Sequence, residues 1–287
     1  MKILVTGSTG FVGKNVINEL LKYDHEIFTT TRSLTSVTPP NKLNPVFLDL
    51  DNIDTQVNYF EHLNKPDLLI HLAWQGLPNY KSLFHFEENL FTHYSFLKNM
   101  VTNGLKNLVV TGTCFEYGMK EGCLSEDMTT DPQNPYALAK DTLRKFLFEL
   151  QKNYEFDCKW IRLFYMYGEG QNPNSLLSQL QTALVNGDKE FNMSGGEQER
   201  DYLPVEKVAE NIVAISCQHK ISGIINCCRG KPLKVKQLVE NYLNENSQEI
   251  KLNPGYYPYT DYEAMSFWGD DTKLKQILIN EKSSRRI

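Results

Sequence analysis

Two residues of this chain, Tyr136 and Lys140, have the types and the spacing of a proton-transfer pair. They lie four positions apart and follow Asn134-Pro135, which is a good helix start, so both side chains should share one face of a helix. A neighbouring ammonium group favours the phenolate and lowers the pKa of a tyrosine from its ordinary value of about 10. We therefore expect Tyr136 to act as a general acid or base near neutral pH, with Lys140 as its partner.

The spacing alone is not specific, because Tyr94 and Lys98 repeat it. The pair at Tyr136 follows a strand-like apolar run that ends in Thr111-Gly112-Thr113, and ligands of open α/β sheets bind at such C-terminal strand ends. Thr113 would then donate a hydrogen bond to a substrate oxygen while Tyr136 delivers the proton. No hydroxyl-bearing strand end lies just upstream of Tyr94, so we interpret that pair as ordinary surface residues of a helix.

A glycine-rich turn near the N-terminus predicts a dinucleotide site. The strand-like segment 3–6 runs into Gly7, Gly10 and Gly13, and a helix-period pattern begins within this turn. Gly7 permits the tight turn, Gly10 lets the backbone approach a diphosphate, and Gly13 allows the helix to pack closely on the strand. The alternative, a tight turn without a ligand, is less favoured in this context of strand and helix.

The end of the second predicted strand indicates which dinucleotide binds there. An acid at this position would accept the ribose 2′-hydroxyl and repel a 2′-phosphate, but the sequence has Thr31-Arg32-Ser33 instead. Hydroxyls and a guanidinium suit a phosphate dianion. We therefore expect NADP(H) to be preferred, with NAD(H) possible. The alternative for Arg32 is a solvated surface charge.

Strand-like apolar runs alternate with helix-period segments through the first 165 residues, which predicts an α/β fold with a mostly parallel sheet covered by helices on both faces. After residue 165 the pattern becomes irregular, which predicts a smaller lobe. We expect a nucleotide-binding domain at 1–165, rejoined by about 205–228, and a substrate lobe at 166–204 and 229–287. The expected strands are 26–30, 46–48, 68–72, 108–111, 159–163 and 224–226, with helical segments that include 86–100 and 136–154.

Composition and charge exclude several classes of protein. The chain is 41% hydrophobic and 23% charged, which is typical of a folded domain, and its net charge of -5 disfavours a nucleic-acid partner. No stretch approaches the roughly 20 apolar residues of a membrane span, and the first apolar run is too short for a signal peptide. We therefore expect no membrane partner and a cytoplasmic location. The six cysteines form no CxxC pair, so neither a metal site nor a disulfide framework is predicted.

Taken together, the motifs resemble those of the extended short-chain dehydrogenase/reductases, in the branch of nucleotide-sugar epimerases, dehydratases and reductases. The resemblance covers nearly the whole chain. The motifs that carry it are Thr6-Gly7-Ser8-Thr9-Gly10-Phe11-Val12-Gly13, Asp49-Leu50, His71-Leu72-Ala73, Asn89, Thr113 with Tyr117-Gly118, Tyr136-Ala137-Leu138-Ala139-Lys140, Arg162 with Tyr167-Gly168, Arg200-Asp201-Tyr202, and Asn226.

The resemblance implies a Rossmann-type doubly wound parallel sheet with a smaller C-terminal α/β substrate lobe, and catalysis by Thr113, Tyr136 and Lys140. It implies that Arg200 contacts the diphosphate of a nucleoside-diphosphate sugar, the alternative being a structural ion pair. The implied substrate contacts are Thr113, Phe115, Tyr165 and Arg200. The implied cofactor contacts are Gly7, Thr9, Gly10, Phe11, Val12, Thr31, Arg32, Ser33, Asp49, Leu50, Leu72, Ala73, Trp74, Asn89, Tyr136 and Lys140.

Departures from the family's motifs narrow the reaction. Similar 4,6-dehydratases have Asp-Glu after the Thr, where this chain has Cys114-Phe115, so dehydration is disfavoured. A 3,5-epimerase step is not expected either, because Phe115 occupies the position at which similar epimerising reductases have a cysteine. Phe164-Tyr165 replaces the Phe-Asn of many relatives, so the placement of the substrate should differ.

We therefore expect the NADPH-dependent reduction of the 4-keto group of a nucleoside-diphosphate 4-keto-6-deoxyhexose, for surface polysaccharide biosynthesis. One alternative is a nucleotide-sugar 4-epimerase with bound NAD, and another is a noncatalytic dinucleotide-binding regulator on the same fold. Arg32 favours the reductase over the epimerase. The family also implies a homodimer formed through segments 86–100 and 136–154, a state that light scattering measures directly.

Overall fold

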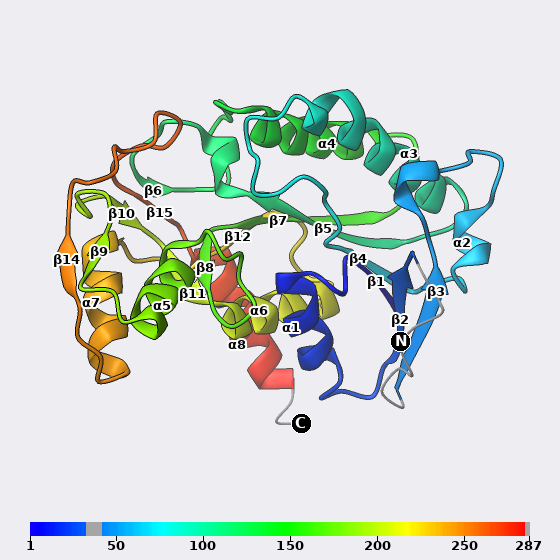
Figure 1. The fold of residues 1–287 in the computed structure, drawn as a ribbon. Helices are drawn as coiled ribbons and strands as arrows, with labels where there is room; N and C mark the ends of the chain where they lie inside the picture. Colours follow the sequence, from blue (N-terminus) through cyan, green and yellow to red (C-terminus); the bar gives the residue numbers. More distant parts are fainter. Residues whose placement is uncertain (33–41, 285–287) are drawn as a thin grey trace.

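The structure is a computed structural model that describes residues 1–32 and 42–284. A parallel seven-stranded sheet in the order β12-β7-β5-β4-β1-β2-β3 forms its centre (Figure 1). Its strands are β1 (Lys2–Thr6), β2 (Glu26–Thr31), β3 (Leu43–Phe47), β4 (Leu68–His71), β5 (Asn107–Thr113), β7 (Asp157–Leu163) and β12 (Gly223–Cys227). The chain extends the sheet in one direction from β1 and in the other from β4, so the strand order reverses between these two neighbours. Ligands of open α/β sheets bind in the crevice at this reversal.

Both faces of the sheet are apolar, because successive side chains of a strand point to opposite faces and both sets are buried in the central strands. Leu4 and Leu69 lie in one core cluster, whereas Ile3, Val5 and Ile70 lie in the other. Each face therefore needs a cover of helices.

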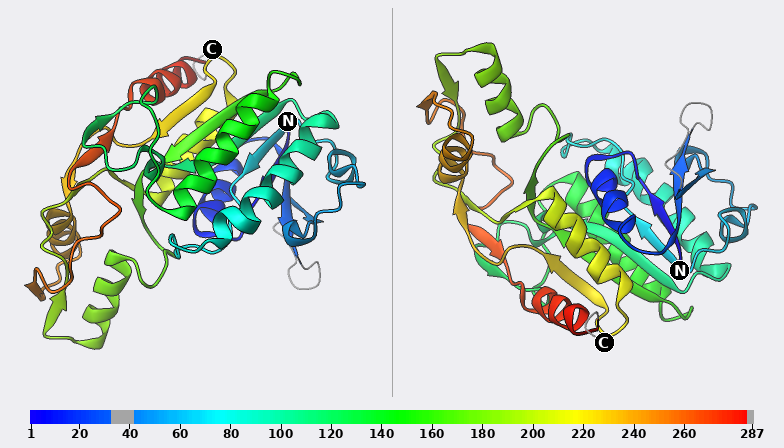
Figure 2. Two further views of the ribbon diagram at one scale, coloured as in Figure 1. Left: turned by 90° about the horizontal axis from the view of Figure 1, so that it is seen from above. Right: turned by 90° about the horizontal axis from the view of Figure 1, so that it is seen from below.

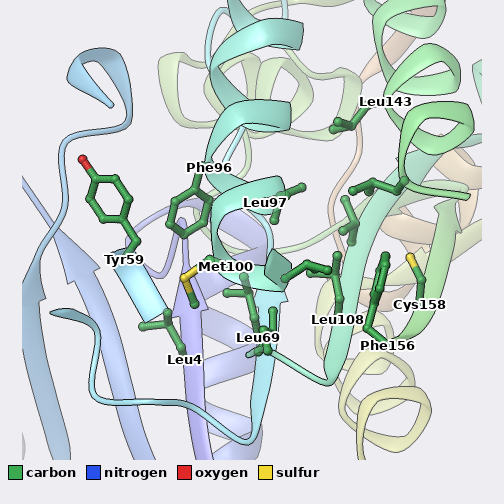
Figure 3. Packing of buried hydrophobic residues seen from close by; sticks show 14 of the residues in the cluster. Leu4, Tyr59, Leu69, Phe96, Leu97, Met100, Leu108, Leu143, Phe156 and Cys158 are labelled. Atoms are coloured by element: carbon green, nitrogen blue, oxygen red, sulfur yellow. The ribbon is translucent and has the colours of Figure 1, made fainter. Parts of the chain in front are cut away.

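Helices cover the two faces as this pattern requires. The helices α3 (Leu90–Thr102) and α4 (Pro135–Leu150) lie on one face, and α1 (Phe11–Leu20), α6 (Val205–Cys217) and α8 (Thr272–Ser284) lie on the other (Figures 1 and 2). Phe96 and Met100 of α3 are fully buried between this helix and the strands (Figure 3). Burial of one such side chain stabilises the fold by about 1.5–3 kcal/mol.

A smaller lobe lies beside the main sheet, at the left of Figure 1. It contains α5 (Leu176–Asn186), α7 (Val235–Glu245) and the parallel pair of β9 (Glu190–Asn192) with β14 (Lys251–Asn253), around a core cluster of its own. Three further pairs of short strands are β6 (Gly122–Leu124) with β15 (Phe267–Gly269), β8 (Tyr165–Tyr167) with β11 (Tyr202–Pro204), and β10 (Glu199–Arg200) with β13 (Leu233–Lys234). One short helix, α2 (Tyr59–His62), follows β3.

The predicted fold class is confirmed, and every predicted strand overlaps a strand of the sheet. Segment 224–226 lies in β12, which pairs with β7 at the edge. The domain boundaries stay a prediction, and the structure differs from them at the C-terminus: α8, assigned above to the substrate lobe, packs against α6 and β12. Leu274 and Ile277 of α8 are buried in the same cluster as α6, a long-range contact that a local pattern does not reveal. No helix within the described ranges is long and apolar enough to cross a membrane.

Candidate functional site

The glycine-rich turn joins β1 to α1 where the strand order reverses. Gly7 has a φ of +71°, a conformation that favours glycine, and a Cβ there would lie 2.7 Å from the Ala73 nitrogen. At Gly13 a Cβ would lie 2.0 Å from the Gly7 carbonyl oxygen, so only glycine lets α1 pack this closely on the turn. The helix begins at Phe11 with no side-chain cap and no acid in its first turn. The turn therefore fits the diphosphate of a dinucleotide, because its amides and the positive end of α1 are available to an anion.

A cavity of about 720 Å³ extends from this turn past the carboxyl ends of β4 and β5 to the segment that precedes α5. This volume suits a small-molecule site. The predicted site residues that line it are Gly7, Gly10, Phe11, Val12, Leu72, Trp74, Thr113, Phe115, Tyr136, Lys140 and Tyr165. One cavity thus brings together the predicted cofactor turn and the three predicted catalytic side chains.

The predicted catalytic side chains converge where β5 ends and α4 begins. Thr113 is the last residue of β5, and its side chain lies near enough to the Tyr136 hydroxyl to favour a lower pKa of Tyr136. Tyr136 lies in the first turn of α4, which Asn134 caps. Lys140 lies one turn further along, and its Nζ donates to the carbonyl oxygen of Thr111 at 2.9 Å. Tyr136 is 7% exposed and Lys140 only 2%, so both groups are almost completely removed from water.

A buried carboxylate, Glu116, holds the end of β5 in place. It lies in the 3₁₀ helix η3 (Cys114–Tyr117) and accepts hydrogen bonds from the Thr113 amide at 2.9 Å and from Trp160 Nε1 at 2.9 Å. Arg162 Nε donates to its other oxygen at 2.8 Å. These charge-assisted bonds fix the backbone from which the Thr113 hydroxyl projects. No sequence pattern points to Glu116, because the side chains that donate to it, Trp160 and Arg162, come from β7, which is distant in sequence.

Burial shifts the acidity of both catalytic groups. It raises the pKa of Tyr136 above its ordinary value, and the nearby Tyr80 and Glu116 act in the same direction. Burial also lowers the pKa of Lys140 to about 7, partly opposed by Glu116. The lowered Tyr136 pKa that the sequence led us to expect is therefore wrong for this structure, since desolvation dominates and the ammonium donates to Thr111. Tyr136 keeps its proton and is suited to donate it.

The end of β2 differs from the expected 2′-phosphate site. Arg32 is 73% exposed and forms an ion pair with Asp51 at 3.8 Å. Asp51 lies in the 3₁₀ helix η1 (Leu50–Asn52) and accepts a hydrogen bond from Gln75 at 2.5 Å. Thr31 is the last residue of β2, and Ser33 lies outside the described residues. The Asp51 carboxylate, which comes from η1 and not from β2, thus lies beside Arg32 and partly offsets its positive charge.

Several predicted cofactor residues do not line the cavity, and their contacts to a cofactor stay predictions. Asp49 caps η1, and Leu50 is buried in the core cluster on the α3 side of the sheet. Ala73 lies against Gly7, while Asn89 donates to the Gln75 carbonyl at 2.9 Å and supports the loop after β4. The predicted residues outside the lining are Thr9, Thr31, Arg32, Asp49, Leu50, Ala73 and Asn89.

Arg200 is engaged in a buried ion pair rather than facing the cavity. It is 3% exposed, and its Nη2 and Nε lie 3.0 and 3.2 Å from a carboxylate oxygen of Glu263. Its Nη1 donates to the Met265 carbonyl at 3.0 Å. Glu263 also accepts from the Tyr165 hydroxyl at 2.5 Å, so the pair orients the Tyr165 ring that lines the cavity. These contacts favour the structural alternative for Arg200 over the predicted contact with a diphosphate.

Sequence analysis missed the loop residues of the cavity. They come from the irregular segments after β4 and before α5, where no periodic pattern marks a side chain as facing a site. Tyr80 contacts the catalytic tyrosine directly: its carbonyl accepts from the Tyr136 amide at 3.2 Å, and the ring centroids lie 5.4 Å apart. The missed lining residues of these two segments are Leu77, Pro78, Tyr80, Gly170, Gln171, Asn172, Asn174 and Ser175.

We predict that Arg200→Met lowers the free energy of unfolding by about 3 kcal/mol, because it leaves Glu263, whose side chain is only 13% exposed, without its counter-charge. Denaturant unfolding measures the loss. The control is Lys234→Met, which removes an ion pair with Glu197 whose two side chains are about half exposed and should cost less than about 1 kcal/mol. A loss no larger for Arg200→Met than for the control would contradict the structural role.

Lys140→Met should change stability in a pH-dependent way. Because the pKa of Lys140 falls to about 7 on folding, the buried ammonium destabilises the native state most at and below neutral pH, and the penalty fades as the pH rises toward the ordinary lysine value. The melting temperature of Lys140→Met should thus exceed that of the wild type at pH 6–7, and the difference should narrow by pH 9. Lys98→Met, at an exposed position of α3, is the control. A difference that does not vary with pH would contradict this account.

Comparison with known proteins agrees with this geometry. A family model described as "NAD dependent epimerase/dehydratase family" matches residues 3–228. The dTDP-6-deoxy-L-talose 4-dehydrogenase (NAD(+)) of Aggregatibacter actinomycetemcomitans is 30% identical over 276 residues, which cover 94% of this chain and 99% of that protein. The GDP-6-deoxy-D-talose 4-dehydrogenase of the same organism is 29% identical over 290 residues, covering 98% and 92%.

A solved structure supports the fold. The UDP-N-acetylglucosamine 4-epimerase from Methanobrevibacter ruminantium M1, in complex with UDP-N-acetylmuramic acid, has a TM-score of 0.83 at 22% identity, covering 96% of this chain and 91% of that one. The resemblance inferred from the motifs is confirmed. This chain belongs to the NAD-dependent epimerase/dehydratase family, in its nucleotide-sugar branch.

Proposed function

We propose that this protein catalyses the reversible, NAD(H)-dependent interconversion of the 4-keto and 4-hydroxy forms of a nucleoside-diphosphate 6-deoxyhexose. The observation that carries the proposal is that Thr113, Tyr136 and Lys140 line the same cavity as the glycine-rich turn. A dinucleotide whose diphosphate binds at that turn can extend along the cavity toward the hydroxyl groups of Thr113 and Tyr136. In one direction this reaction is the 4-keto reduction expected from the sequence, and in the other it is the oxidation of the 4-hydroxyl group.

Each catalytic side chain has a distinct part in this reaction. When bound, the cofactor supplies or accepts a hydride at the sugar carbon. Tyr136 donates its proton to the sugar oxygen during reduction and takes it back during oxidation. Thr113, held beside Tyr136, donates a hydrogen bond to the same oxygen and stabilises the charge that develops there. Lys140 supplies a positive charge at the ribose side of the site.

NAD(H) replaces the NADP(H) that the sequence led us to expect. Asp51 lies next to Arg32, and a carboxylate at this place repels a 2′-phosphate and can accept a ribose hydroxyl. The family description and the name of the 30% identical relative both specify NAD. The comparisons therefore do not support a preference for NADP(H).

The wall of the cavity favours a 6-deoxy sugar. The side chains around Thr113 and Tyr136 are mostly apolar or aromatic, among them Leu77, Pro78 and Phe115. Such a wall accommodates a C6 methyl group, whereas a hydroxymethyl or carboxylate group would lose hydrogen bonds to water without replacing them. The names of the two relatives above, both of them 6-deoxytalose 4-dehydrogenases, agree with this choice. Asn172 and Asn174 offer amide donors to a diphosphate where Arg200 does not.

A nucleotide-sugar 4-epimerase is the second candidate. The family description names epimerases, and an epimerase with bound NAD uses the same catalytic groups to oxidise and re-reduce one sugar. The comparisons support this alternative better than they support an NADPH-dependent reductase. A noncatalytic regulator is disfavoured, because the catalytic set is intact and buried in a cavity.

The cellular role and the assembly stay predictions. We propose a cytoplasmic enzyme of surface polysaccharide biosynthesis that forms a homodimer through α3 and α4. Phe91 on α3 is 56% exposed and Leu138 on α4 is 45% exposed, so both helices present apolar side chains that a second copy can cover.

The proposed function is tested with a panel of nucleoside-diphosphate 4-keto-6-deoxyhexoses, by following NADH and NADPH absorbance. We expect a 4-keto sugar to oxidise NADH, and NADPH to react more slowly. Interconversion of an intact nucleotide sugar without added cofactor, together with no net NADH consumption, would replace the reductase by the epimerase.

Tyr136→Phe should lower kcat by about 10²–10⁴-fold, because it removes the proton donor and leaves the shape of the cavity nearly unchanged. Tyr94→Phe is the matched control: Tyr94 has the same spacing to a lysine, but its ring packs on Phe146 between α3 and α4 at 5.1 Å. Steady-state rates of the two variants decide the matter. Equal rates in both would mean that Tyr136 is not the acid.

A further inference from the structure

The indole ring of Trp74 connects the charged and aromatic groups behind the catalytic cavity. Trp74 follows β4, is half-buried and lines the cavity. The Nζ of Lys140 lies 4.0 Å from the centroid of its ring. The ring of Tyr136 meets it edge-on at 6.2 Å, and the ring of His93 stacks on it at 4.6 Å with an angle of 17°. Trp74 therefore contacts both members of the proton-transfer pair.

The Lys140 ammonium has few anchors for a charge so deeply buried. Its hydrogen bond to the Thr111 carbonyl and its contact with the Trp74 ring hold it directly, and the more distant Glu116 carboxylate favours its charge. A lysine has three N–H donors and is strongly hydrated in water, so its burial is costly. The electron-rich face of an indole attracts a cation, and the attraction strengthens when the pair is desolvated.

The ring itself is fixed from both sides. Trp74 Nε1 donates to His85 Nδ1 at 3.1 Å, so the neutral His85 carries its proton on Nε2, which donates to the Asn79 carbonyl at 2.9 Å. This bond sets the orientation of the indole in its own plane. The stacked ring of His93 sets its tilt. Both histidines belong to elements that pack beside α4: His85 begins the π-helix η2 (His85–Asn89), and His93 lies in α3.

The histidines around Trp74 bring no competing charge. His93 Nδ1 lies 2.8 Å from His71 Nε2, and His71 Nδ1 lies 2.8 Å from the Thr6 hydroxyl. Burial lowers the pKa of His71 to about 3 and lowers that of His93 as well, so both rings are neutral at physiological pH. A neutral imidazole can stack on the indole without repelling Lys140.

We propose that Trp74 is a positioning residue that holds the Lys140 ammonium, in its charged form, against the ribose side of the cavity and beside Tyr136. The assignment of Lys140 and Tyr136 rests on the proposed function. The direct contact of Trp74 with the cofactor stays a prediction, since Trp74 lines the cavity, and the action through the lysine is proposed in addition to it. The residue sets the charge that the cofactor meets without touching the reacting atoms.

The proposal predicts a change in pH dependence when the ring is removed. The groups that face Lys140 are Glu116 of η3, which favours the ammonium, the neutral His71, His85 and His93, and Tyr136 on its own helix. In addition to these groups, the indole face of Trp74 stabilises the charged form of Lys140 and not the neutral form. Removal of the indole therefore lowers the pKa of Lys140. Binding of the anionic NADH should then weaken at a lower pH than in the wild type.

The test measures the dissociation constant of NADH by calorimetry from pH 6 to 9, with no sugar present. Trp74→Leu should weaken binding about threefold to tenfold at pH 7.5 and move the midpoint of the pH profile down by about half to one unit. Trp74→Phe keeps an aromatic face and should fall between Trp74→Leu and the wild type. Thermal melting and near-ultraviolet circular dichroism establish that each variant is folded.

A double-mutant cycle with Lys140→Met separates an action through the lysine from a direct contact. In the Lys140→Met background, Trp74→Leu should have little further effect on NADH affinity. An equal loss in both backgrounds, or an unshifted pH midpoint in Trp74→Leu, would overturn the proposal. This measurement of NADH affinity does not depend on the sugar. If no sugar of the panel reacts but the double-mutant cycle still shows coupling between Trp74 and Lys140, only the proposed substrate is refuted.

Discussion

The burial of one ammonium group, that of Lys140, is the constraint on which the site depends. A charge taken out of water costs several kcal/mol unless fixed dipoles and counter-charges replace its hydration. Here the Thr111 carbonyl, the Trp74 ring and the more distant Glu116 carboxylate provide that environment. They belong to β5, to the end of β4 and to η3, which meet only because the sheet places β4 beside β5. The local pair in α4 therefore acquires its chemistry from the complete fold.

Two ion pairs, of Glu116 with Arg162 and of Glu263 with Arg200, orient the walls of the cavity. Glu116 accepts from the Thr113 amide and from Arg162, and Glu263 joins Arg200 to the Tyr165 hydroxyl. Apolar side chains of similar volume can stabilise a core as well as a buried ion pair does. The hydrogen bonds of an ion pair are directional, however. Here the hydrogen bonds of the two carboxylates fix the positions of the Thr113 hydroxyl and the Tyr165 ring. We infer that the geometry of the cavity, more than the stability of the fold, explains both pairs.

Sequence reasoning succeeded where a local pattern determines the structure. The strands, the glycine-rich turn, and the placement of Thr113 and Tyr136 at one sheet edge follow from periodicity, from the steric needs of Gly7 and from the topology of parallel sheets. It failed where the deciding partner is distant in sequence. Burial reversed the expected shift of the Tyr136 pKa, Asp51 changed the surroundings of Arg32, and Glu263 engaged Arg200. In all three cases the residue itself was identified, and its electrostatic surroundings were not.

The aromatic wall of the cavity bears on the choice between the two candidate reactions. The rings of Tyr80 and Tyr165 lie 5.3 and 6.1 Å from that of Phe115, and the three come from the loop after β4, from β8 and from η3. An epimerase must present either face of its keto intermediate to the same nicotinamide, so the sugar needs room to turn. We infer that three rings fixed by separate elements would hold a pyranose in one orientation, from which hydride transfer reaches one face only. On this inference the wall fits the proposed 4-dehydrogenase, while the catalytic residues alone fit either enzyme.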